Sequence, residues 1–444
     1  MNVLLIAANT ATVPYPVYPL GMSVVAGAVQ RAGHRVSQCD FLVAGQSLDA
    51  IHARVVRENP DVVGISIRNV DNVNLLNEQR YIDVVKDLVD TVRAAGCGRV
   101  ILGGSGFTIF PDSILRATGA DFGLVGEGEE SLPRLLTALA AGEKIPHAII
   151  HADVPRLTKI SMNSALYDPE LVDYYMKHSN VIAVQTKRGC AHKCVYCSYP
   201  MLEGDETRSR DPEQVVDDIQ HLIAAHKAEL LFFTDSIFND DDDAYLDVLR
   251  AMARRGVRVP WTAFFKPAAF SEEAMELFKT TGLKAIELGS DAACDTTLKG
   301  LNKAFTFADI RRTNDQFAAA GVAVAHYYMF GGPGETADTV REGVKNILSL
   351  KHCVSFMFMG IRILPGTPLE KLALKQGIIT PETNLLEGGY YLSPDVDADW
   401  MEKELTDAFA HVRNCVFPPD AMAEHVQLLH KLGYTGLLWD MLIT

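Results

Sequence analysis

Three cysteines lie within eight residues of one another near the middle of this 444-residue chain. Cys190, Cys194 and Cys197 are separated by three and then two residues, so one loop can wrap their thiolates around a single centre. Thiolates suit iron–sulfur chemistry, and three ligands leave the fourth iron of a 4Fe-4S cluster open to a substrate or cofactor. The spacing therefore predicts a catalytic 4Fe-4S cluster with these cysteines as its metal ligands.

Two other interpretations of the cysteines are less favourable. A zinc site would need a fourth ligand, and although His192 is close, the spacing is unusual for zinc. Three incidental core cysteines would not share a polar loop that contains a glycine, Gly189.

The Cys-x3-Cys-x2-Cys pattern after a predicted strand resembles the radical S-adenosylmethionine (SAM) superfamily. Tyr196 matches the aromatic residue usually found before the third cysteine, and the resemblance covers roughly residues 180–365. It implies that SAM chelates the open iron through its amino and carboxylate groups, and that reductive cleavage gives a 5′-deoxyadenosyl radical. Tyr196 is expected to lie at this cofactor site.

The resemblance also implies SAM contacts at the C-terminal ends of the barrel strands, where ligands of such folds bind. The expected contacts are Thr234, Asp235 and Ser236 for the methionine amino group, Glu287, Gly289, Ser290 and Asp291 for the ribose, and Gly331, Gly332 and Pro333 for the adenine. The alternative for Asp235 and Asp291 is a helix N-cap. Lys266 is a lone cation directly after a predicted strand. It is either part of the site at the strand ends or a member of a surface ion pair.

Polar or glycine-containing turns follow the predicted strands of the first 145 residues. They supply Leu20, Gly21, Ser66, Arg68, Asn69, Asn72, Gly103, Gly104, Ser105, Gly106, Gly126, Glu127 and Gly128. These turns should gather at one edge of a sheet, where glycines let a large flat ligand lie across it. The turn after the first strand lacks Gly-x-Gly-x-x-Gly, which disfavours a nicotinamide site.

This region resembles the cobalamin-binding domain that one large subclass fuses to the radical SAM barrel. The Asp-x-His-x-x-Gly motif is missing, so no histidine in that position can ligate cobalt. Ser66-Ile67-Arg68 falls where the family has an element beneath the corrin, which implies a catalytic Arg68 under the cobalt. A guanidinium is not a lone-pair donor and would leave the lower face unligated. The alternative is an ion pair between Arg68 and Asp71.

The elements that position these residues form two alternating series. In the first, strands at 2–8, 34–41, 62–67, 99–102 and 122–125 alternate with helices at 20–33, 48–59, 78–95 and 129–142. This predicts a doubly wound, Rossmann-like parallel sheet. In the second, strands at 181–186, 230–234, 259–265, 285–289, 323–330 and 355–361 alternate with helices at 212–226, 241–255, 271–281, 306–320 and 336–350, which predicts a partial (βα)6 barrel.

We therefore expect an α/β protein with four regions. They are a cobalamin-binding domain at 1–147, a linker at 148–180, the barrel at 181–364, and a mainly helical substrate or capping region at 365–444. The last region, with Tyr390, Tyr391 and Trp400, is expected to close the barrel mouth or the substrate pocket. His326, Tyr327 and Tyr328 are candidate substrate contacts or core residues, and the remaining cysteines (Cys39, Cys97, Cys294, Cys353 and Cys415) are expected to be buried and free.

Composition narrows the partners. The net charge of -15 disfavours nucleic acid and anionic membranes as binding partners. The sequence contains no uninterrupted apolar run of about 18 residues, so no membrane-spanning helix is expected. The N-terminus does not resemble a signal peptide, and the cysteine usage suits a reducing compartment, so a cytoplasmic location is expected. We expect a small-molecule or peptide substrate and an electron donor such as flavodoxin or ferredoxin.

The leading functional hypothesis is a cobalamin-dependent radical SAM methyltransferase acting on a carbon centre. A ring closure or rearrangement without methyl transfer is the alternative within enzymology. A cobalamin or redox sensor is the alternative of another class. A methylthiotransferase is disfavoured because only Cys39 and Cys97 precede the motif, whereas that family needs three further cysteines for a second cluster.

Overall fold

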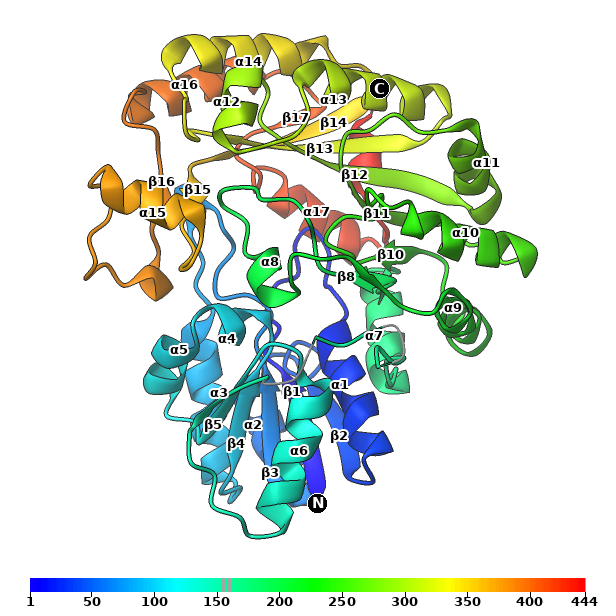
Figure 1. Cartoon of the computed structure of the whole chain (residues 1–444), viewed down its shortest axis with the longest axis vertical. Coiled ribbons are helices and arrows are strands. Elements are labelled where there is room, and N and C mark those ends of the chain that lie inside the picture. The colour runs from blue at the N-terminus through cyan, green and yellow to red at the C-terminus, as the bar shows by residue number, and fades with distance from the viewer. Residues whose placement is uncertain (153–155, 159–160, 444) are drawn as a thin grey trace.

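Two parallel β-sheets, one above the other, form the frame of the protein in a computed structural model that describes residues 1–152, 156–158 and 161–443 (Figure 1). The lower sheet has six strands in the order β2-β1-β3-β4-β5-β6. Their bounds are β1 Asn2–Ala7, β2 Arg35–Asp40, β3 Val62–Ser66, β4 Val100–Gly103, β5 Phe122–Val125 and β6 Ile149–His151.

Helices cover both faces of this sheet, because its strands are apolar runs that must be buried on both sides. The helices are α1 Leu20–Arg31, α2 Leu48–Glu58, α3 Ile82–Ala94, α4 Ser105–Ile109, α5 Pro111–Thr118 and α6 Gly128–Ala140. Helices α1 and α6 pack together, as do α2, α3 and α5. The strand order reverses next to β1, and ligands of such sheets bind at the carboxyl ends around that point.

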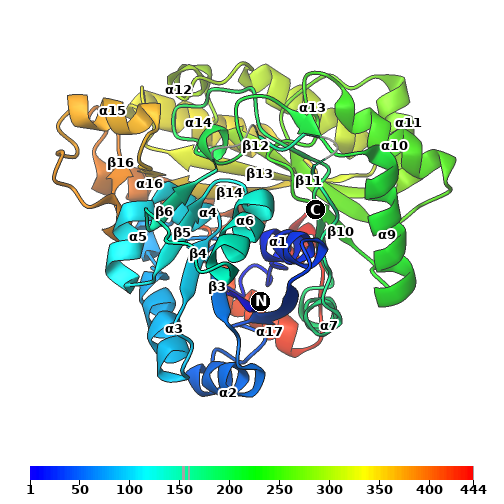
Figure 2. The same cartoon turned by 60° about the horizontal axis from the view of Figure 1, so that its bottom comes forward.

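The upper sheet is a parallel half-barrel of seven strands in the order β17-β14-β13-β12-β11-β10-β7. The bounds are β7 Ile182–Val184, β10 Leu231–Phe233, β11 Trp261–Phe265, β12 Leu283–Asp291, β13 Ala323–Phe330, β14 Cys353–Met359 and β17 Cys415–Val416. Its outer face carries α9 Pro212–His226, α10 Ala244–Arg254, α11 Glu272–Thr281, α12 Asp295–Gly300, α13 Phe307–Ala319 and α14 Ala337–Ser349, and Figure 2 shows α11–α14 above the strands, away from the lower sheet.

Short elements connect the two sheets and close the chain. They are α7 Pro169–His178, the β8 Lys187–Arg188 and β9 Arg208–Ser209 hairpin, α8 Tyr199–Leu202, the β15 Ile361–Arg362 and β16 Tyr390–Tyr391 pair, α15 Pro368–Lys375, α16 Ala398–Phe409, α17 Ala423–Lys431 and the 3-10 turns η1 Leu75–Asn77, η2 Leu385–Glu387 and η3 Trp439–Leu442.

The fold class is the predicted one, with three differences in detail. The segment predicted as a linker contains β6, which pairs with β5, and α7. The C-terminal region adds β17 to the barrel sheet beside β14. Tyr390 and Tyr391 form a two-stranded pair with β15, and neither they nor Trp400 is among the described residues that line the main cavity. No helix in the described ranges is long and apolar enough to cross a membrane.

Candidate cofactor and active site

A cavity of about 700 Å³ lies where the carboxyl edge of the lower sheet faces the half-barrel. Every residue predicted as a cobalamin contact lines it, from Leu20 and Gly21 after β1 to residues 126–128 after β5. Residues of the barrel, including Gln185, Thr234 and Phe264, line the same cavity. The structure therefore brings the predicted cobalamin contacts together at the carboxyl edge of the lower sheet, which faces the barrel. This edge is called the cobalamin edge below.

Glycines shape the cobalamin side of the cavity. A Cβ atom added at Gly103 or Gly21 would meet no atom within 4 Å, so both glycines border open space. At Gly104, with φ +95°, a Cβ would lie 2.5 Å from the carbonyl oxygen of Ile67, so the tight packing of this turn requires glycine. A bare, open backbone edge fits a large flat cofactor such as cobalamin.

Arg68 is exposed at this edge and lines the cavity. The alternative interpretation of Arg68 was wrong, because Asp71 forms a buried ion pair with Arg362 at 2.8 Å instead. In the described residues, no carboxylate oxygen lies within 4.0 Å of the Arg68 guanidinium. Burial raises the pKa of Tyr15, and the nearby Arg68 charge offsets part of that rise. The guanidinium is therefore free to face a ligand in the cavity.

The cysteine loop lies between β8 and β9, in the connection of that hairpin. Cys190 N–H donates to Gly204 O at 3.0 Å, and Cys197 N–H donates to Cys194 O at 3.2 Å. Burial raises the pKa of the Cys190 thiol, and it raises that of Cys197 to about 12, so their thiolates need cationic compensation. Among the described residues, no three His, Cys, Asp or Glu side chains converge tightly enough for one metal ion. Three half-buried thiols in one loop are a donor set that fits an iron–sulfur cluster.

A buried cation connects the cysteine loop to the end of β12. Lys303 Nζ donates to the Tyr196 hydroxyl at 3.2 Å and forms an ion pair with Asp291. The Lys303 charge also acts on the thiols of Cys190 and Cys197, lowering their pKa against the effect of burial. Sequence reasoning missed Lys303 because no motif surrounds it.

Asp235 and Ser236 hold the backbone that leads into the cysteine loop. The Asp235 carboxylate accepts from Thr186 N–H at 2.7 Å and from Lys187 N–H at 3.1 Å, and Ser236 Oγ donates to Gly189 O at 2.9 Å. Asp235 is not a helix N-cap, since α10 begins after Asp243.

The remaining strand-end predictions lie at different depths in the barrel. Ser290 Oγ bonds to His326 Nδ1 at 2.8 Å on the outer face, so His326 is a core residue there. Asp291 is not an N-cap, since Cys294 caps α12. Gly332 packs among apolar side chains, and Glu287 faces the lumen, where Tyr327 contacts it. Of the strand-end residues predicted to contact SAM, Thr234 borders the cavity in the described structure.

Lys266 and Tyr328 have the structural surroundings given as their alternatives, an ion pair and a core position. Lys266 forms an ion pair with the exposed Asp241 and lies 3.4 Å from His192 Nε2. Tyr328 is fully buried. The cysteines outside the motif are buried and free, as predicted.

A buried ion-pair network joins the cobalamin edge to the cysteine loop. Glu127 Oε1 pairs with Arg188 at 3.1 Å and with Arg208 at 2.9 Å, while Glu129 pairs with the second terminal nitrogen of Arg188 at 2.5 Å. Glu127 Oε2 also accepts from Leu157 N–H at 2.9 Å. The predicted cofactor contact Glu127 thus has its carboxylate engaged by protein groups, and sequence reasoning missed both arginine partners.

The comparisons with known families agree with this geometry. Residues 6–136 match the B12 binding domain, and residues 184–347 match the Radical SAM superfamily. The chain belongs to the radical SAM enzymes that carry a B12-binding domain.

Among relatives of this cobalamin-dependent radical SAM chain is the tryptophan 2-C-methyltransferase of Streptomyces laurentii, 24% identical, with 81% of this chain and 73% of the relative covered. The anaerobic magnesium-protoporphyrin IX monomethyl ester cyclase of Rubrivivax gelatinosus is 22% identical, with 74% and 61% covered. The fold is shared with the radical SAM methyltransferase TsrM of Kitasatospora setae, solved with tryptophan and a SAM analogue, at a TM-score of 0.86, 22% identity and coverage of 99% and 97%.

Proposed function

We propose that this protein is a cobalamin-dependent radical SAM methyltransferase that acts on a carbon centre of a small molecule or peptide. The observation that carries the proposal is a single cavity bordered by both predicted cofactor sites. Residues 103–106 of the cobalamin edge line it together with Arg188 and Ser198, which flank the cysteine loop on either side. A methyl group can pass between two cofactors only if they share such a space.

The chain's own residues divide the work between holding and orienting. Cobalamin supplies methyl transfer when bound, SAM supplies the methyl group, and the cluster supplies an electron and an open iron. Cys190, Cys194 and Cys197 would hold the cluster. The glycine edge would hold the corrin, and Arg68 offers cobalt no lone pair. The similarity to the tryptophan 2-C-methyltransferase supports the proposed methyl transfer to a carbon centre.

The proposed function also assigns a role to each region of the chain and requires an electron donor. We infer a cobalamin-binding domain at 1–147, a barrel at 181–364 and a C-terminal region at 365–444 that covers the barrel lumen. The cluster needs an electron from outside the chain, and a flavodoxin or ferredoxin has the required chemistry.

The test is to purify the protein without oxygen, reconstitute it with iron, sulfide and hydroxocobalamin, and supply SAM with a deuterated methyl group and a reductant. Labelled methyl on cobalamin together with S-adenosylhomocysteine is the expected result. SAM cleavage without any methylated cobalamin would overturn the methyltransferase and favour a ring closure or rearrangement; the cyclase relative carries out a ring closure. No SAM consumption would favour a sensor.

Two matched pairs of variants assign the cofactor sites. Gly103→Val fills open space at the cobalamin edge, so cobalamin retention should fall while iron content stays unchanged; Gly98→Val, which also meets no atom within 4 Å, is the control. Cys194→Ala should lose iron and keep cobalamin, with the buried Cys97→Ala as control. Retained cobalamin in the Gly103 variant would place the cofactor elsewhere.

A further inference from the structure

The lumen of the half-barrel contains an apolar cluster of its own. Its residues in the barrel strands or directly before them are Val181, Leu230, Phe232, Ala285, Ala325, Val354 and Val416. Tyr15, from the loop after β1, covers this cluster from the lower domain, and Leu437 and Trp439 cover it from the C-terminal segment. Two segments far apart in sequence thus cover the lumen.

Glu287 lies inside this apolar environment. Its side chain projects from β12 beside Phe264 of β11 and Ala325 of β13, and it is 4% exposed. The Tyr327 hydroxyl donates to Oε2 at 3.1 Å. In the described part of the chain, no Lys, Arg or His nitrogen forms an ion pair with this carboxylate. Burial raises the pKa of Glu287 to about 7.

A buried carboxylate without a cation is costly, and proteins keep such groups ionised when a partner compensates the charge. The surroundings of Glu287 suit a cation that comes from a ligand. Tyr327 stacks on Phe356 with ring centroids 5.4 Å apart, and the Trp439 indole lies beside the carboxylate and lowers its pKa against the effect of burial. Aromatic faces around a carboxylate attract ammonium groups.

The cavity adjoins this place through shared aromatic residues. Tyr15, Phe232 and Phe264 line the cavity and also border the lumen, and Phe264 is 38% exposed although it lies on the inner face of the sheet. The charges of Glu287 and Arg68 both act on the pKa of Tyr15, so Tyr15 lies near the lumen carboxylate and near the cobalamin edge. A molecule held at Glu287 would extend along these rings toward the cobalamin side.

We propose that Glu287 is a specificity-determining residue that binds the protonated amine of the substrate, whose aromatic body lies against Phe264 and Tyr15. The ligand class is therefore an arylalkylamine or a compound containing one. The role of this amine as the substrate rests on the proposed methyltransferase function. The binding of an amine at Glu287 rests on the residues of the lumen alone.

The test measures binding of two amines and two acids to the protein loaded with cluster and cobalamin. Tryptamine and phenethylamine are compared with 3-indolepropionate and 3-phenylpropionate by isothermal titration calorimetry at pH 8. Both amines should bind at least ten-fold more tightly than the acids of the same ring. Glu287→Gln should weaken amine binding at least ten-fold and leave the acids unchanged, because glutamine keeps the shape and removes the charge.

Two further variants keep the result unambiguous. Asp40→Asn removes another buried carboxylate that lies outside the lumen, and it should leave amine binding unchanged. Tyr327→Phe removes the neutral donor from Glu287 and should maintain or strengthen amine binding even if the Gln variant fails to fold.

Equal binding of acids and amines, no amine binding, or loss of binding in Tyr327→Phe would overturn the assignment. Methylation of cobalamin is measured separately, so a protein that binds amines without methylating cobalamin would overturn only the proposed function.

Discussion

Glu127 lines the cavity, and Glu287 lies beside the cavity-lining Phe264. Both carboxylates are largely removed from solvent, yet their surroundings are opposite. Burial would raise the pKa of Glu127, but the hydrogen bond from Arg208 and the charge of Arg188 hold it below its ordinary value. Glu287 has no such cation, and burial raises its pKa to about 7. A carboxylate saturated by arginines is a structural connector, whereas one left without a cation is available to a ligand.

The connector has a definite position in the fold. Arg188 lies two residues before Cys190, and its carboxylate partners belong to the turn and first helical residues after β5. The network therefore fixes the cysteine loop against the cobalamin edge. Bidentate arginine pairs set orientation as well as distance, which suits a junction that must keep two cofactor sites facing each other.

The largest expected effect comes from breaking this junction. Arg188→Gln leaves Glu127 and Glu129 buried with less compensation, and removal of one partner from a buried pair costs about 3–5 kcal/mol of unfolding free energy. Urea unfolding of the apoprotein at pH 7 measures the loss. The exposed Arg250, paired with Glu273, is the control, and Arg250→Gln should cost less than about 1 kcal/mol. Similar losses for both variants would remove the distinction between connector and surface pair.

The next effect concerns the lumen carboxylate and pH. The pKa of Glu287 rises from an ordinary 4.5 to about 7 in the folded protein, so folding is favoured by the protonated form. Wild-type stability should therefore fall as the pH rises through this interval, and Glu287→Gln should escape that fall. The stability difference between variant and wild type should grow by about 2.5 kcal/mol from pH 5 to pH 8. Urea unfolding without ligand measures it; a difference independent of pH would mean that Glu287 already has a compensating charge.

A third buried carboxylate shows that the absence of a cation is not sufficient to mark a ligand site. Burial raises the pKa of Asp40 to about 6, but neutral donors satisfy it: Tyr175 hydroxyl at 2.9 Å, Asn9 Nδ2 at 3.0 Å and Leu42 N–H at 2.8 Å. These bonds attach α7 to the end of β2. Asp40 is thus a connector built from neutral groups.

Tyr175→Phe tests this intermediate case. It removes a donor to a buried, ionised carboxylate and should cost about 2 kcal/mol at pH 8, with a smaller cost at pH 5 where Asp40 is protonated. Tyr174→Phe is the neighbouring control, because the described structure gives its hydroxyl no hydrogen bond. Amine binding by the loaded protein should stay unchanged. Weakened amine binding would extend the ligand site to Asp40 and break the comparison.

Local sequence signals predicted the frame and the cofactor edges. The polar or glycine-containing turns after β1, β3, β4 and β5 are contiguous motifs, as is the cysteine loop, and parallel topology gathers the turns at one edge of the lower sheet. The strands β6 and β17 were missed because they have three and two residues, too few for a periodic pattern to show. Helix α7 was missed in a segment of mixed periodicity with several prolines nearby.

The partners within the site depend on long-range folding, which the chain order does not reveal. Arg188 and Glu127 are 61 residues apart, and Arg362 and Asp71 are 291 apart. Arg68 was assigned a possible partner in Asp71 because they are three residues apart, but the β15 arginine occupies that carboxylate. Glu287 was placed with the ribose contacts because its strand-end position is visible in sequence, whereas its aromatic surroundings come from segments far apart in the chain.

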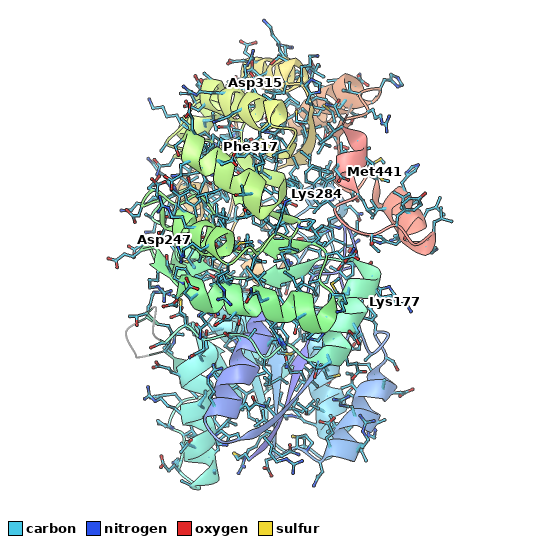
Figure 3. The ribbon with its side chains drawn as sticks, turned by 90° about the vertical axis from the view of Figure 1, so that its right-hand side faces the viewer. Lys177, Asp247, Lys284, Asp315, Phe317 and Met441 are labelled. Carbon is cyan, nitrogen blue, oxygen red and sulfur yellow. The ribbon has the colours of Figure 1, made fainter. Side chains whose placement is uncertain are left out.

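The smallest expected effect concerns the C-terminal segment around Leu437 and Trp439, which covers Glu287 and is called the cover here. Lys284, at the start of β12, forms a 3.2 Å ion pair with Asp440 of η3, and Figure 3 shows Lys284 near Met441 of the same turn. The Lys284 side chain is 45% exposed, so Lys284→Gln should cost less than about 1 kcal/mol in urea unfolding and leave amine binding unchanged. The buried Leu437 and Trp439 hold the cover by apolar packing, which a distant surface charge does not alter. Loss of amine binding in this variant would mean that a solvent-exposed charge controls access to the lumen carboxylate, and the environment of Glu287 would then depend on surface charge rather than on burial.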